Sequence, residues 1–272
     1  MCLEFLSLSP PAPLHHFIES IWDFQARARP HALERVLPVP AAGLILNLAE
    51  ARTRVYDEAL NCSDFSAMTL DGPRTRSLII DTEEQVAVMG VVFRPGGASL
   101  FFRERLDRLL NDSVDLEALV GSSANLLREQ LLEARSARRR LAQLLRWLQQ
   151  RSTVLRPCSA LQHALRTLDA RPRIDALAAT ARELGCSPRT LGERFRQQVG
   201  MSPKRYLRLR RFQQVLAATA ISGQRVDWAG LAVDCGYHDQ AHLAHEFREF
   251  SGLSPTAYSR LRAPWGSHVV LP

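Results

Sequence analysis

The sequence lacks the cysteine pattern of a disulfide scaffold or of a structural zinc site. Its five cysteines are odd in number and include no C-x-x-C pair, whereas such frameworks need paired or closely spaced cysteines. No stretch approaches 18 uninterrupted apolar residues, and no charged segment followed by an apolar run opens the chain. These absences predict a cytoplasmic protein with reduced thiols and without a membrane partner.

Sequence motifs of catalysis are missing as well. The chain contains no G-x-S-x-G elbow, no P-loop and no dinucleotide-binding glycine pattern, each of which positions a nucleophile or a phosphate. His15, His16 and His31 hint at a metal site, but no ligand spacing supports it. We therefore expect a protein that is not an enzyme and has neither metal nor cofactor. An enzyme is the rival class, which metal analysis of the purified protein would test.

Lysine is nearly absent, since Lys204 is the only lysine among 35 basic residues. The positive charge is unevenly placed, because residues 156–272 hold 17 Lys and Arg against 9 Asp and Glu, whereas residues 1–155 are close to neutral. A basic excess confined to one part of a chain is typical of a domain that neutralises nucleic-acid phosphates. A merely solubilising surface is the alternative interpretation.

The N-terminal part, residues 1–121, is predicted to be a mixed α+β domain. A helix is expected over 15–24, where Phe17, Ile21 and Phe24 have helical spacing, and another over 97–110. Short apolar runs separated by turn residues indicate a small antiparallel sheet or barrel between these helices. The expected strands are 43–48, 53–56, 68–70, 77–80 and 86–93.

Two further helices, over 122–133 and 136–150, are expected to form a connector at residues 122–156. Arg138, Arg139 and Arg140 precede a leucine stripe in the second helix. That pattern fits either a dimer helix or the solvated end of a packed helix. A linker with Pro157 is expected over 151–159.

A duplication organises residues 157–264, which are predicted to be all-helical. At an offset of 52 residues, seven of the 16 positions from Leu191 to Tyr206 are identical to those from Leu243 to Tyr258. In each copy a short Ala-rich helix ends at a glycine, which can adopt the left-handed conformation that closes a helix. A polar residue then caps a second helix.

Both copies have the form of helix-turn-helix units. Gly185 and Gly236 end the first helices, and Ser187 and Asp239 begin the second. One long helix is expected between the units, over 203–220. It would hold two recognition helices in successive major-groove segments, about 34 Å apart along the duplex.

These residues resemble the DNA-binding domain of the AraC/XylS family. The stretch that opens G-C-S-P-R-T-L-G-E-R-F-R at Gly185 is similar to the first half of that domain, and the stretch from Gly236 to Tyr258 is similar to its more diagnostic second half. The resemblance covers roughly residues 160–262. It implies a seven-helix domain that binds double-stranded promoter DNA, usually as an activator acting with RNA polymerase. More loosely, residues 35–38, 44–48 and 90–97 resemble an uncharacterised N-terminal domain of some members.

Carried over by position, the resemblance implies which side chains contact DNA. The guanidinium of Arg189 can form two hydrogen bonds with a guanine, and the side-chain amide of Gln240 can form two with an adenine. The residues expected to read bases are Arg189, Thr190, Glu193, Gln240, His242 and His245. The residues expected to contact the DNA backbone are Arg196, Lys204, Arg205, Arg208 and Arg248. Gly192, Glu193, Thr180 and His245 depart from the residues usual in the family. With Gly192 and Glu193 in its recognition helix, the first unit is expected to discriminate bases weakly.

The N-terminal domain is expected to bind a small-molecule effector or to mediate homodimerisation, and thereby to control DNA binding. Trp22, Asn47, Tyr56 and Arg94 are candidate ligand-binding residues by residue type alone. The alternative is an architectural DNA-binding protein without an effector. Either protein would be associated with the nucleoid.

Overall fold

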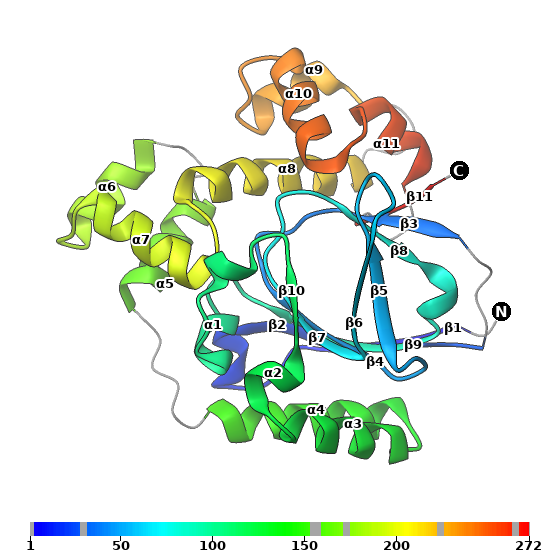
Figure 1. The fold of residues 1–272 in the computed structure, drawn as a ribbon. Coiled ribbons are helices and arrows are strands. Elements are labelled where there is room, and N and C mark those ends of the chain that lie inside the picture. The colour runs from blue at the N-terminus through cyan, green and yellow to red at the C-terminus, as the bar shows by residue number, and fades with distance from the viewer. Residues whose placement is uncertain are drawn as a thin grey trace.

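The protein consists of a two-sheet N-terminal part and a helical C-terminal part, an α+β architecture that confirms the predicted fold class (Figure 1). The computed structural model describes residues 3–27, 32–152, 159–170, 175–221, 226–262 and 267–271.

The first sheet has six antiparallel strands in the order β1-β2-β9-β4-β7-β10. Their bounds are Leu3–Leu8, Ile18–Ala26, Ala87–Phe93, Gly43–Asn47, Met68–Asp71 and Ser113–Asp115. The second sheet has the order β11-β3-β8-β5-β6, with bounds His268–Val270, Leu33–Val36, Leu78–Asp81, Arg52–Tyr56 and Cys62–Ser66. All five strands expected from the apolar runs are therefore confirmed.

The helix expected over 15–24 is wrong. A single 3₁₀ turn, η1 (Leu14–His16), is followed at once by β2. β2 pairs with both β1 and β9, and its register shifts at a bulge between Ile18 and Ser20. A bulge adds a residue to a strand, so it displaces the two-residue alternation of apolar side chains along β2. β-branched and aromatic residues such as Ile21 and Trp22 also favour strands.

The single helix expected over 97–110 is also wrong. α1 (Ala98–Phe102) ends at Arg103, which has a left-handed φ of 52°, and a 3₁₀ segment, η3 (Leu106–Leu109), follows. Leu106 is buried although the chain has changed direction. The apolar residues of this stretch thus belong to two short elements rather than to one helical face.

The predicted connector is helical but packs as part of the N-terminal unit. α2 (Leu116–Val120), α3 (Ser123–Glu133) and α4 (Ala137–Ser152) contribute to the core that also contains the sheet residues Ile21 and Leu44. The leucine stripe of α4 lies in this core, and Arg140 forms a buried ion pair with Asp23, with Nε 2.6 Å from Oδ2. The stripe is accordingly the face of a packed helix. Of the expected linker, residues 153–158 lie outside the described residues.

Candidate nucleic-acid interface

Seven helices make up the described portion of residues 159–262, as the resemblance implied. They are α5 (Ser159–Ala170), α6 (Asp175–Glu183), α7 (Pro188–Val199), α8 (Pro203–Ile221), α9 (Trp228–Asp234), α10 (Gln240–Ser251) and α11 (Pro255–Leu261). The two second helices of the predicted units are α7 and α10, and the expected connecting helix is α8.

The duplication in the sequence is also a duplication in the local structure. The side chain of Ser187 accepts a hydrogen bond from the amide of Thr190 at 3.1 Å, and that of Asp239 accepts one from the amide of His242 at 2.7 Å. Both helices are 12 residues long and end at glycines with φ of 88° and 70°. The same caps therefore begin and end both helices.

The first turns of α7 and α10 project into solvent. Arg189 and Thr190 are exposed on α7, as are Gln240 and Ala241 on α10, while His245 is exposed one turn further along. Of the expected backbone contacts, Arg196, Lys204, Arg205 and Arg248 are exposed. These side chains are exposed to solvent, Arg196 while it is paired with Glu193, and their contacts with DNA stay predictions.

Glu193, in the middle of α7, is already engaged by other side chains. Its carboxylate accepts hydrogen bonds from Arg196 at 2.8 Å and from Gln197 at 2.7 Å, and Arg105 of the N-terminal part lies 3.4 Å away. The hydrogen bond from Arg196, followed by that from Gln197, holds the pKa of Glu193 below its usual value. Glu193 is thus a charged carboxylate with protein partners, which adds a physical reason to the doubt about its reading of bases.

A buried carboxylate organises α10. Glu246 is 3% exposed, and it pairs with Arg208 at 2.5 Å and with Arg211 at 3.3 Å, both on α8. Arg208 also pairs with Glu249. Arg208 therefore fixes α10 on α8. A DNA phosphate would compete with the carboxylates of Glu246 and Glu249 for its guanidinium. Sequence reasoning missed this cluster, whose one signal was a glutamate on the apolar side of α10.

His242 is held in place rather than free to move. Its ring packs edge-on against Tyr237 with centroids 5.3 Å apart, and its Nδ1 accepts a hydrogen bond from the amide of His238 at 3.4 Å. Its Nε2 lies 3.6 Å from Glu246. Both ring nitrogens of His242 thus face protein partners, and its reading of a base stays a prediction.

The helical domain is docked on the N-terminal part at both units. β11, which follows α11, pairs with β3. At the end of α10, the guanidinium of Arg35 donates to the carbonyl of Ser251 at 3.0 Å and also binds Glu58 at 2.8 Å. At the first unit, α7 packs on η3. Sequence reasoning gave no sign of these contacts.

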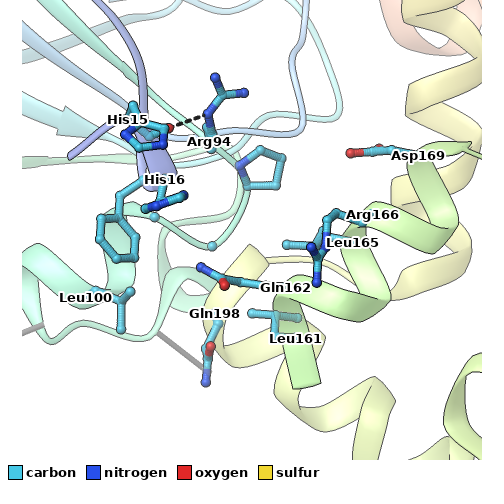
Figure 2. A pocket seen from close by; sticks show the side chains of 14 residues that line it. His15, His16, Arg94, Leu100, Leu161, Gln162, Leu165, Arg166, Asp169 and Gln198 are labelled. Carbon is cyan, nitrogen blue, oxygen red and sulfur yellow. Dashed lines mark hydrogen bonds between the residues drawn. The ribbon is translucent and has the colours of Figure 1, made fainter. Parts of the chain in front are cut away.

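Two cavities lie beside this docked arrangement. One, of about 660 Å³, lies between the two sheets, and its lining includes Trp22, Phe24 and His268. The other, of about 360 Å³, lies at the junction of the two parts, and its lining includes Arg94 and Leu161 (Figure 2).

Two of the candidate ligand-binding residues thus line a cavity, Trp22 the first and Arg94 the second. Asn47 and Tyr56 line neither of these two cavities. Asn47 is fully buried and fixes a turn, since its side chain binds the carbonyl of Glu84 and the amides of Ala49 and Glu50. Tyr56 lies on β5 beside β6 and β8.

Among the described residues, no group of three His, Cys, Asp or Glu side chains could hold a metal ion. The helices of the same part of the chain are too short or too polar to cross a membrane.

Comparison with known proteins separates the two parts in the same way. Residues 180–261 match the model of a helix-turn-helix domain, and residues 6–115 match a domain of unknown function, DUF6597. The regulator GadX of Escherichia coli is 36% identical over 87 residues, and the transcriptional activator RhaR of Escherichia coli K12 is 30% identical over 81 residues. These matches cover 32% and 30% of this chain, and 31% and 28% of the two relatives, so the chain spans about a third of their length.

Solved structures show weaker likeness. ToxT of Vibrio cholerae matches 94% of this chain and 97% of its own, with a TM-score of 0.48 and 9% identity. A DNA-binding transcriptional dual regulator of Escherichia coli K-12 matches 40% of this chain and 96% of its own, with a TM-score of 0.33 and 28% identity.

The C-terminal part is a helix-turn-helix domain, of the class with which transcription regulators bind DNA. More narrowly, it is an AraC-type domain with two such units, which confirms the resemblance drawn from the sequence.

Proposed function

We propose that this protein regulates transcription by inserting α7 and α10 into successive major-groove segments of promoter DNA. The observation that carries the proposal is the repetition of one helix, capped by a side chain at its start and by a glycine at its end and with an exposed first turn, on the two sides of α8 in the chain. α8 is a single helix of 19 residues that contacts both α7 and α10. Since both helices pack on this one rigid element, their relative position is fixed, which supports the insertion of two recognition helices on one face of a duplex.

The second unit is proposed to supply most of the sequence discrimination. Gln240 is exposed in the first turn of α10, where an amide can bind adenine through two hydrogen bonds. α10 is fixed on α8 by the buried carboxylate of Glu246, which pairs with Arg208 and Arg211. In the first unit Arg189 is the base-reading candidate, and Glu193 is engaged by Arg196.

The test is binding of the full-length protein to genomic DNA fragments at several salt concentrations. We expect a motif of two half-sites about 10 bp apart and a steep loss of affinity with salt. Gln240→Ala should weaken specific binding by about 1–3 kcal/mol and leave binding to random DNA nearly unchanged. Gln149→Ala, at an exposed position of α4, is the matched control.

Two outcomes would contradict this proposal. An equal loss by Gln240→Ala on specific and random DNA would remove the base-reading role of that residue. Salt-dependent binding without any sequence preference would favour the alternative of an architectural DNA-binding protein.

We further propose that the N-terminal part controls DNA binding through an effector in the cavity between the sheets. The cavity is lined mainly by apolar side chains, with a polar edge where His268 Nδ1 lies 3.0 Å from Glu34. Since β11 pairs with β3 and contacts α11, a ligand touching His268 would act on a strand that docks the helical domain. Val92→Trp, which fills the cavity from β9, should abolish any shift in melting temperature caused by an effector from a metabolite screen.

Homodimerisation is the other proposed route of control, and sedimentation of the full-length protein tests it. A monomer whose melting and DNA binding no metabolite alters would rule out both routes. We propose activation rather than repression, in contact with RNA polymerase, because RhaR is named an activator. Transcription in vitro with purified polymerase gives the sign directly.

A further inference from the structure

A buried carboxylate behind the second recognition helix gathers nitrogen atoms from three side chains. Oε1 of Glu246 lies 2.5 Å from Nε of Arg208, 3.3 Å from Nη2 of Arg211 and 3.6 Å from Nε2 of His242. The two arginines stand on α8, against which α10 packs (Figure 1). His242 stands in the first turn of α10. Glu246 therefore connects α8 with the end of α10 that is proposed to enter the major groove.

The contacts of the His242 ring also fix the place of its proton. Nδ1 accepts a hydrogen bond from the amide of His238 at 3.4 Å, so a neutral ring carries its proton on Nε2. Nε2 is the nitrogen beside Glu246. The backbone and the buried carboxylate thus hold the ring from its two nitrogens.

Arg211 extends these contacts to the turn of the unit. Its Nη1 donates to the carbonyl of Gly236 at 3.1 Å, and its guanidinium lies 5.0 Å from the centroid of the Tyr237 ring. The Tyr237 ring packs edge-on against His242. The turn, α8 and the first turn of α10 are therefore joined in one closed set of contacts around Glu246.

Arg208 is the cation of this set that lies nearest to solvent. Its side chain is 25% exposed, and the exposed Lys204 lies on the same side of α8, four residues earlier. A free guanidinium beside Lys204 would bind a DNA phosphate whatever the base sequence. Arg208 is instead held by Glu246 and Glu249. The two carboxylates thus remove one sequence-independent contact from this side of α8.

From this arrangement we infer that Glu246 determines the specificity of the second unit without touching DNA, a role that rests on the proposed function. Glu246 positions the reading end of α10 through His242 and Arg211, and this effect acts only at the site whose bases α10 reads. Glu246 also withholds Arg208 from the phosphate backbone, in place of the contact expected for that arginine. This second effect removes affinity that all sequences share.

Binding of the full-length variant Glu246→Gln to the motif found with genomic fragments, and to random DNA, tests both effects. Glutamine keeps the size of glutamate and removes its charge. We expect the ratio of specific to random affinity to fall about tenfold, an effect of the size of one mismatched base pair. Random DNA should be bound about fivefold more tightly at about 0.15 M salt, because Arg208 gains a phosphate. The slope of log K against log salt should be steeper by about 0.9.

Further variants show whether Arg208 causes the steeper slope. Arg208→Gln added to Glu246→Gln should return the slope to its original value. Arg208→Gln alone should leave the slope nearly unchanged, whereas Lys204→Gln should reduce it by about 0.9. This pair decides the second effect even if Glu246→Gln does not fold. Glu133→Gln, which removes an exposed carboxylate of α3, is the control of equal charge and should leave both the ratio and the slope unchanged.

NMR of the imidazole nitrogens without DNA tests the positioning separately from the proposed function. We expect the Nε2–H tautomer of neutral His242, and nitrogen shifts that change in Glu246→Gln. The Nδ1–H tautomer would overturn the inference, as would an unchanged salt slope of Glu246→Gln on random DNA. An equal loss of affinity on specific and random DNA would show a structural role only and would overturn it too. So would a slope for Arg208→Gln that falls as far as that for Lys204→Gln. Absence of sequence preference in the unchanged protein would refute the proposed function, and the inference with it, whatever the tautomer.

Discussion

Two glycines of the first helix-turn-helix unit allow the contribution of domain docking to the free energy of unfolding to be measured separately from backbone strain. Gly185 and Gly200 both end helices with positive φ, of 61° and 88°. A Cβ on Gly185 would meet nothing within 4 Å, whereas a Cβ on Gly200 would lie 2.4 Å from Cγ of Pro73 and 2.9 Å from the carbonyl oxygen of Leu106. Pro73 and Leu106 belong to the N-terminal part.

Alanine at either position should be strained, because a left-handed conformation costs an L-residue about 1–2 kcal/mol. Gly185→Ala should lose only this amount. Gly200→Ala must in addition push η3 away from α7, and overpacking of a tight contact costs about 1–3 kcal/mol. We therefore expect Gly200→Ala to destabilise the protein by about 1–3 kcal/mol more than Gly185→Ala.

Urea unfolding of the full-length variants, followed by circular dichroism, measures this difference. Gly252→Ala is an informative third variant, because its Cβ would lie 2.2 Å from Nη1 of Arg35, the atom that binds the carbonyl of Ser251. Its loss should also exceed that of Gly185→Ala, because Arg35 must leave this partner. If Gly200→Ala loses no more than Gly185→Ala, the packing of α7 on η3 does not contribute to stability, and the docked arrangement is not rigid at this point.

Three further predictions concern one contact between the two parts and two contacts within them. Arg35→Ala should destabilise the full-length protein by about 2–3 kcal/mol, since the hydrogen bond of a charged donor to the end of α10 is lost. A change below about 0.5 kcal/mol in urea unfolding would show that this contact does not contribute to stability. Asp23→Ala should cost about 3–5 kcal/mol in the same assay, because Arg140 is left buried without its partner; the exposed Asp64→Ala is the control and should change little. The pKa of Asp239 is lowered, mainly by the hydrogen bond that its carboxylate accepts from the amide of His242. The carboxylate therefore stabilises α10 fully above the ordinary Asp pKa of about 4. This stabilisation is lost as the pH falls through the lowered pKa. Hydrogen exchange of α10 should accordingly speed up on acidification, and a variant with Asp239→Ala should lose this part of the pH dependence.

The helical domain was largely predictable because its signals are local. A helix cap joins residues three positions apart, as Ser187 and Thr190 show, and a closing glycine such as Gly200 acts on its own helix. Both features are legible in the order of residues. The offset of 52 residues between the two units then predicted that the same local structure occurs twice, and it does.

The N-terminal half was less predictable because strand pairing is not local. The spacing of Phe17, Ile21 and Phe24 fitted a helix, and only pairing with β1 and β9 makes this segment a strand. Asn47 resembled a ligand-binding residue by type, although three backbone partners use it to fix a turn.

What the sequence by itself determined was the presence of two capped helices, α7 and α10, and of the long helix α8 between them. What only the tertiary structure decided was which charges remain available. Arg208 and Glu246 are 38 positions apart and meet only because α10 packs on α8, so no local pattern could show that this arginine has a protein partner. Electrostatic interactions depend on distance in space, and the fold alone sets that distance.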